Sequence, residues 1–79
     1  SLKGANLNRA LLEFASLKNA DLSGVSLKES EIAGADLTGA NVAGADFTGA
    51  DVNSARIGAI SGAPKNLDKA KNVDKAYRN

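Results

Sequence analysis

Cysteine and histidine are absent from the 79-residue chain, and proline occurs once. Without cysteine there is no disulfide and no thiolate chemistry, and without histidine the commonest general base and metal ligand is missing. Ten lysines and arginines face nine acids, which argues against nucleic-acid binding driven by overall positive charge. No apolar run approaches the roughly 18 residues that a membrane span needs. We therefore predict no cofactor, no nucleic-acid partner and no membrane insertion.

Aromatic residues are also scarce, since they make up 4% of the chain and comprise Phe14, Phe47 and Tyr77. A chain of this length is one small domain whose single core is only marginally sufficient. With so few rings, the core must be filled by smaller side chains, for which alanine is the obvious candidate.

Large apolar residues recur at every fifth position without an insertion: Leu2, Leu7, Leu12, Leu17, Leu22, Leu27, Ile32, Leu37, Val42, Phe47, Val52 and Ile57. Two positions before each of the last eleven stands a smaller residue: Ala5, Ala10, Ala15, Ala20, Val25, Ser30, Ala35, Ala40, Ala45, Ala50 and Ala55. A period of five fits neither the 3.6 of an α-helix nor the 2.0 of a flat strand. It indicates a chain that bends at a constant interval, with two side chains of each pentad inward and three outward.

The segments Ala20–Gly24, Ala35–Gly39 and Ala45–Gly49 read A-D-(L/F)-(S/T)-G, which resembles the A-(D/N)-L-x-x motif of pentapeptide-repeat proteins. The resemblance covers residues 1–60 and implies an all-β solenoid, a right-handed quadrilateral β-helix of about three coils with four pentads in each. Side chains twenty residues apart would then stack, with Ala35 between Ala15 and Ala55. Ser30 would be the one inward polar residue, and we expect its hydroxyl to bond a backbone carbonyl.

The repeat ends after Ile57, and apolar residues then recur at near-helical spacing among lysines and aspartates. The pattern predicts two parts, a β-helix over residues 1–62 and an amphipathic capping α-helix over 63–79. We expect the helix to contact the last coil through Leu67, Ala70, Val73 and Tyr77. A membrane-surface helix is the alternative, but a narrow stripe with one aromatic favours the cap.

The pentad Ala10–Phe14 departs from the motif, because Leu11 and Phe14 occupy outward positions that are elsewhere polar or glycine. Exposed apolar residues of this kind indicate a contact surface. Together with Leu2 and Leu7 of the first coil they are the predicted protein-contact residues. We expect an upstream segment, a protein partner or self-association through the N-terminal coil to cover them.

The alternative site is acidic. Glu13, Glu31 and Asp51 fall on one face, so a cation-binding or small-ligand-binding role is the second hypothesis. Catalysis by such carboxylates would need a pocket and perturbed pKa values, which a flat wall does not provide. Regular ice binding needs many outward threonines, and only Thr38 and Thr48 are present.

The sequence thus favours a non-enzymatic module with a structural or protein-binding role. Proteins that it resembles are abundant in cyanobacteria and in the thylakoid lumen, which leaves lumen, periplasm and cytoplasm open as compartments. Some relatives in the quinolone-resistance group mimic DNA, but three coils and a net charge of +1 depart from the long acidic rod that this requires. No signal peptide is visible, and a start at Ser1 rather than methionine is consistent with upstream residues removed by processing, so the compartment stays open.

Overall fold

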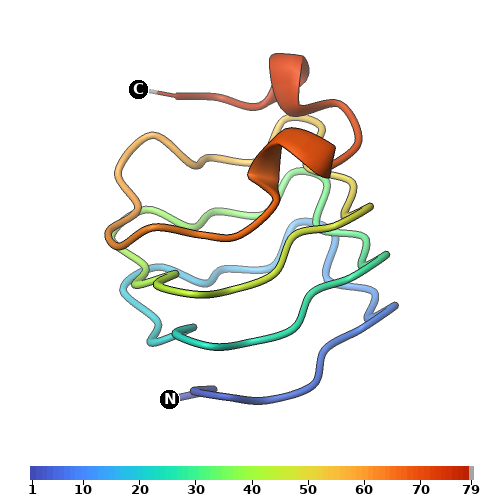
Figure 1. The fold of residues 1–79 in the computed structure, drawn as a ribbon. Helices are drawn as coiled ribbons and strands as arrows, with labels where there is room; N and C mark the ends of the chain where they lie inside the picture. Colours follow the sequence, from blue (N-terminus) through green and yellow to red (C-terminus); the bar gives the residue numbers. More distant parts are fainter. Residues whose placement is uncertain (79) are drawn as a thin grey trace.

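The computed structural model describes residues 1–78, which wind as a coil of stacked levels from one end of the molecule to the other (Figure 1). Isolated parallel bridges join the levels, and through the first three levels the bridged residues are twenty apart. On one wall, for example, Leu11 bridges Glu31 and Glu31 bridges Asp51. This is the register expected from four pentads in each coil.

Each pentad bends because its backbone closes a tight turn. The N–H of Ala5 donates to the carbonyl of Leu2 at 2.9 Å, and the N–H of Ala35 donates to that of Ile32 at 3.0 Å. The residue before the small one has a left-handed φ, for instance 67° at Gly24 and 61° at Phe14. Such a turn suits glycine, because other residues pay a steric cost for positive φ.

Between turns, the backbone of each wall bonds the neighbouring levels. Leu7 and Arg9 donate their N–H groups to the carbonyls of Ser26 and Lys28 at 2.8 and 2.9 Å. In the reverse direction Ser26 donates to the carbonyl of Ala5 at 3.0 Å. Each wall contributes a single bridged residue, which satisfies the backbone without forming a long strand.

The core lies inside the second and third levels, where large and small residues alternate. Its buried members are Leu22, Val25, Leu27, Ile32, Ala35, Leu37, Ala40, Val42, Ala45, Phe47, Ala50, Val52, Ala55 and Ile57. Leu7, Leu12 and Leu17 of the first level pack against this cluster while partly exposed. Small side chains are sufficient to fill the interior because every level repeats the same pattern of volumes.

Ser30 is buried as expected, at 1% exposure, but its hydroxyl does not bond a carbonyl. Within residues 1–78 the Ser30 Oγ has no hydrogen-bond partner. The neighbouring carbonyls are engaged in the ladder, since Ala10 accepts from the N–H of Glu31 and Ser30 itself accepts from that of Asp51. The expectation of a hydroxyl–carbonyl bond at Ser30 was therefore wrong.

The C-terminal segment is not the predicted α-helix. Two short 3₁₀ helices, η1 (Leu67–Lys69) and η2 (Val73–Lys75), are the helical segments of the described chain. Residues before, between and after them bridge the third level. Residues 61–78 therefore form a fourth level, which Figure 1 shows in orange and red above the third. The boundary predicted between residues 62 and 63 falls inside this level, because Ser61 already bridges Asn41.

The misreading has a simple cause. In a pentad the large residue precedes the small one by three positions, and the next large residue follows two later. In the fourth level the repeat has six residues, Asn66–Lys71 and Asn72–Tyr77, so both intervals become three and imitate helical periodicity. The added residues also shift the bridges, which join Asp46 to Lys65, Asp51 to Lys71 and Arg56 to Tyr77. Neither 3₁₀ segment, nor any other part of residues 1–78, is a helix that could cross a membrane.

Candidate protein-contact surfaces

The walls of the coil carry the side chains that a partner would meet. We call the outward residues of pentads 6–10, 26–30 and 46–50 the second wall, and those of pentads 11–15, 31–35 and 51–55 the third wall. Within the described chain no pocket is detected on any wall. The candidate surfaces are therefore distinguished by the chemistry of their side chains.

Leu11 and Phe14 lie on the third wall and are exposed, at 73% and 83% of their surface. Leu11 stands beside Glu31, to which its backbone is bridged. The Phe14 ring leans over Gly34 in the second level, because a Cβ added at Gly34 would lie 2.6 Å from two ring carbons. Glycine at position 34 thus makes room for an aromatic ring that still leaves most of its surface to solvent.

The other two predicted contact residues of the first level are less available. Leu2 is 38% exposed, and Leu7 is partly buried against the core. Both belong to the inward series that fills the coil. The structure therefore separates the four predicted residues into a solvent-facing pair, Leu11 and Phe14, and a pair that faces the interior.

The acidic residues of the third wall do not converge. Glu31 and Asp51 are neighbours across a bridge, yet within residues 1–78 no three acidic residues gather as metal ligands would. Asp51 is already engaged, since it accepts hydrogen bonds from the Asn72 side-chain amide and the Asn53 N–H, both at 3.0 Å. These two bonds, the Asn72 bond foremost, lower the pKa of the Asp51 carboxyl.

The other three aspartates that directly precede a large inward residue also make local hydrogen bonds. The Asp46 carboxylate accepts from the Thr48 hydroxyl at 2.7 Å and from the Thr48 N–H at 3.0 Å. With a further bond from Asn66, these contacts lower the pKa of Asp46 to about 2. Asp21 and Asp36 make the same contacts with Ser23 and Thr38, and their pKa values are lowered as well. Such bonds stabilise a bend of the backbone. They also occupy one oxygen of each carboxylate with hydrogen bonds from the same turn.

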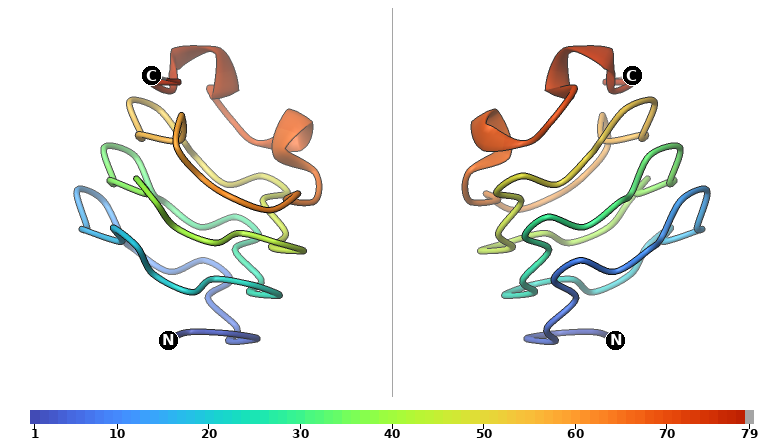
Figure 2. Two further views of the ribbon diagram at one scale, coloured as in Figure 1. Left: turned by 90° about the vertical axis from the view of Figure 1, so that its left-hand side faces the viewer. Right: turned by 90° about the vertical axis from the view of Figure 1, so that its right-hand side faces the viewer.

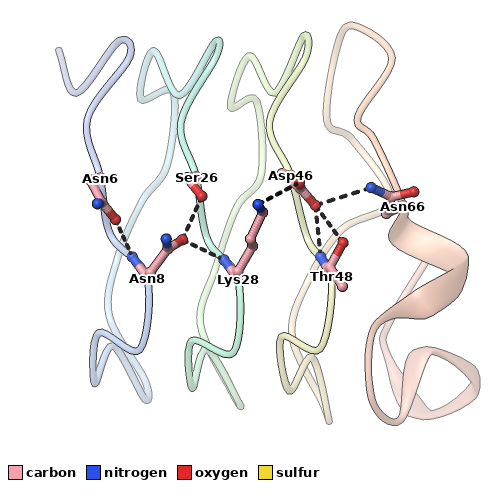
Figure 3. Close-up of polar contacts among 7 residues, drawn as sticks. All are labelled: Asn6, Asn8, Ser26, Lys28, Asp46, Thr48 and Asn66. Carbon is pink, nitrogen blue, oxygen red and sulfur yellow. Dashed lines mark hydrogen bonds and ion pairs between the residues drawn. The ribbon is translucent and has the colours of Figure 1, made fainter.

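The second wall shows how polar side chains also join one level to the next (Figure 3). The Asn8 carbonyl oxygen accepts from the Ser26 hydroxyl and from the Lys28 N–H, in the second level. The Lys28 ammonium lies 3.9 Å from the Asp46 carboxylate, an exposed ion pair of small energetic value. These side chains bond one another rather than converging on a site for a ligand.

Three of the four residues predicted to contact the last coil pack against the core, although they lie in turns and extended segments rather than in an α-helix. Leu67, Ala70 and Val73 are partly buried and pack against the core. Tyr77 is 52% exposed, and the Arg56 guanidinium lies 6.0 Å from its ring centroid. The backbone of Tyr77, rather than its ring, makes its bond to the third level, where its N–H donates to the Ala55 carbonyl at 2.8 Å.

Two residues of evident structural importance are Asn66 and Asn72. The sequence interpretation used Asn66 only as one of two candidates, with Pro64, for the start of the predicted α-helix, and it did not use Asn72. Each has a left-handed φ, 60° and 61°, and precedes a 3₁₀ helix. Each also donates its side-chain amide to an aspartate of the third level, Asn66 to Asp46 at 3.2 Å and Asn72 to Asp51 at 3.0 Å. The signal was present as a repeat, N-L-D-K-A-K followed by N-V-D-K-A-Y.

Comparison with known families agrees with this geometry. The family described as pentapeptide repeats (8 copies) matches residues 5–42 and 26–57, so the matched region runs from residue 5 to residue 57. This is more than half of the chain, and the chain belongs to the pentapeptide-repeat family. No curated protein and no solved structure matches it.

Proposed function

We propose that this chain is a non-enzymatic module that binds a protein through the third wall, with Leu11 and Phe14 as the anchors. Pentapeptide repeats are generally structural or protein-interaction modules. We also propose that its coil is the right-handed quadrilateral β-helix that the family generally forms. The twenty-residue register of the bridges supports that assignment. On this proposal the coil is a rigid support, and function lies in the side chains on its walls.

The observation that carries the proposal is the exposure of Leu11 and Phe14, at 73% and 83%, on one wall of one level. Phe14 also has a φ of 61°, a left-handed conformation that costs a non-glycine residue of this size about 1–2 kcal/mol. Covering both side chains would contribute about 3–5 kcal/mol at the usual value for a large apolar residue. That is equivalent to roughly 100- to 1,000-fold in affinity or more.

The neighbours of the pair define the chemistry of the partner. Glu13 lies in the same pentad, Glu31 is bridged to Leu11, and Asp51 follows one level further along the wall. The low pKa of Asp51 keeps its carboxyl ionised. Complementary charge steers binding and fixes orientation, so the partner is expected to present an apolar group flanked by lysine or arginine.

The test immobilises three versions of this chain and compares the proteins that bind to each of them. One is the parent and one carries Leu11→Ser with Phe14→Gly, which gives both positions residues that occur outward elsewhere. The matched control carries Ser16→Ala with Asn19→Gly, at the equivalent positions of the next wall. Asn19 has a φ of 59°, so the control relieves the same backbone strain without touching the pair.

The proposal is supported if a protein is retained by the parent and the control but not by the Leu11→Ser/Phe14→Gly chain. Its affinity is then measured by titrating the purified protein against each purified chain. We expect at least a hundredfold weaker binding by the double variant, which follows from the apolar area that it removes. If the retained protein is a second copy of this chain, the module is self-associating. Equal retention by all three chains would overturn the assignment of the third wall.

A further inference from the structure

We infer that the two six-residue repeats, Asn66–Lys71 and Asn72–Tyr77, form a closing level that pairs with the coil on one side and prevents another chain from pairing on the other. We call these repeats the hexads. This inference concerns the end of the coil and goes beyond the binding function proposed for the third wall. The occupant that the hexads exclude is a second copy of this chain, whose coil has the same ladder spacing.

The first argument concerns one backbone N–H group, the one two residues after the large residue of each repeat. In the pentads of residues 2–55 the N–H two residues after the large residue bonds the next level, as Arg9 bonds the Lys28 carbonyl and Glu29 bonds the Thr48 carbonyl, both at 2.9 Å. Lys69 holds that position in the first hexad. Its N–H donates instead to Asn66 within the hexad, at 2.9 Å. Lys75 and Asn72 repeat the arrangement at the same distance.

The side of the hexad that faces the third level keeps the whole ladder. Phe47 and Gly49 donate to the carbonyls of Lys65 and Lys69, both at 3.0 Å. In return, Lys65 donates to the carbonyl of Ala45 at 2.7 Å. A pentad makes the same three bonds with the level that precedes it in the chain. The hexad therefore keeps its backbone pairing with the third level, and the loss of a ladder donor is confined to the side that faces away from the coil.

The second argument concerns the asparagine inserted in each hexad. It explains why the N–H groups of Lys69 and Lys75 bond within their own hexad. Asn66 and Asn72 stand between the bridged lysine and the large residue, where a pentad has no residue. Their left-handed φ values of 60° and 61° start the 3₁₀ turn, and asparagine tolerates this conformation better than most residues. Their side chains donate to Asp46 and Asp51, which holds each turn against the third level.

The third argument is the shape of the closed side. Figure 2 shows both 3₁₀ turns rising from the last level, away from the stack, where an incoming strand would have to lie. Lys69 and Lys75, the last residues of the two turns, are exposed. Projecting turns and lysines are among the devices by which natural sheets prevent edge-to-edge pairing. The hexads thus combine a lost donor and a steric obstacle with exposed charged side chains.

The experiment removes the inserted residues. Deletion of Asn66 and Asn72 converts both hexads to pentads, and we expect the restored donors to let two chains pair. The matched control, Asn66→Gly with Asn72→Gly, keeps six residues and the left-handed φ. All chains carry Leu11→Ser and Phe14→Gly, so that association through the third wall does not contribute. Sedimentation equilibrium then measures the mass of each chain as a function of concentration.

We expect the mass of the deletion variant to rise with concentration to at least that of a dimer, while the glycine control keeps the mass of its parent background. A folded deletion variant whose mass equals that of the control would overturn the inference. If the deletion variant does not fold, the inference is tested on the parent chain instead. Nuclear magnetic resonance must then detect through-hydrogen-bond coupling from the Lys69 amide to the Asn66 carbonyl and from Lys75 to Asn72. The absence of that coupling contradicts the closing level.

Discussion

The first three levels and the fourth level solve the same packing problem with different numbers of residues. A pentad places one large and one small side chain inward and uses the left-handed residue near its end, as at Gly24 and Gly44. A hexad also places one large and one small side chain inward, as Leu67 and Ala70 show. Its left-handed residue, however, comes at the start. The comparison teaches that the inward pair of a large and a small residue defines a level, and that the fourth level keeps this pair while its left-handed residue moves to the start of the repeat.

The largest expected loss of stability comes from enlarging an inward alanine of the middle levels, which tests whether they are packed more tightly than the fourth. Ala35 is completely buried, and the register stacks it between Ala15 and Ala55, so Ala35→Leu should lower the free energy of unfolding by about 2–3 kcal/mol through overpacking. Ala70 is only partly buried, so Ala70→Leu should cost much less. Urea denaturation of both variants measures the difference. Equal losses would contradict the proposed contrast between the two regions.

The next effect tests whether the fourth level contributes to the core at all. Leu67 packs partly buried against the core, so Leu67→Asp would place an unpartnered charge there and cost about 1–2 kcal/mol of unfolding free energy. The control is Lys69→Asp, which puts the same carboxylate on an exposed residue of the same turn. Thermal unfolding compares the two. If both variants melt at the same temperature, residues 65–78 are a loosely held tail.

A smaller difference separates two glycines with positive φ. Gly24 has open surroundings, with its nearest atoms 3.9 Å from an added Cβ, whereas an added Cβ at Gly62 would lie 2.8 Å from the Ala43 backbone. Both alanine variants pay the cost of left-handed φ. Gly62→Ala must also push the fourth level from the third, so we expect it to be less stable than Gly24→Ala by about 1 kcal/mol. Chemical denaturation of the pair checks this ranking, and the reverse order would contradict the close approach of the levels.

The smallest expected effect is the response to acid. The folded chain holds the pKa of Asp46 at about 2, below its ordinary value of 3.8. Between these two pH values the folded state therefore binds fewer protons than the unfolded state. The stability linked to Asp46 is therefore fully present above pH 3.8 and is lost as the pH falls through about 2. Asp46→Asn removes the titration and should flatten this part of the curve of melting temperature against pH. An unchanged acid slope would show that Asp46 is not held by Thr48 and Asn66.

The residues of the pentads were sufficient to predict the coil, its register and its core, because the inward series has a period that no helix or flat strand shares. Ala35 and Phe47 could be assigned to the core from their positions in the repeat alone. The fourth level could not be read in the same way, because its intervals of three match a helix. What separates the two interpretations is the choice of asparagine at positions 66 and 72, and its meaning depends on φ values and on aspartates of the preceding level.

The exposure of the two proposed contact residues was predictable from the sequence, whereas their contact with a partner stays a prediction. The departure of Leu11 and Phe14 from the motif was visible in the sequence, and their exposure agrees with the outward positions assigned to them. The packing of the Phe14 ring on Gly34 was not predictable, because it requires the direction in which a left-handed corner residue points its side chain. The proposed acidic site could not be judged from sequence either, since the bonds from Asn53 and Asn72 to Asp51 arise only when the levels are stacked.

The central claim is that residues 61–78 are a further level of the coil, and one measurement tests it most directly. Through-hydrogen-bond coupling in nuclear magnetic resonance identifies the carbonyl that accepts from a given amide. The structure pairs the Lys71 amide with the Ala50 carbonyl at 2.7 Å and the Tyr77 amide with the Ala55 carbonyl at 2.8 Å. Coupling of Lys71 to Ala50 and of Tyr77 to Ala55 is the predicted result. Coupling of Lys71 to Leu67 and of Tyr77 to Val73, the pattern of an α-helix, would contradict it.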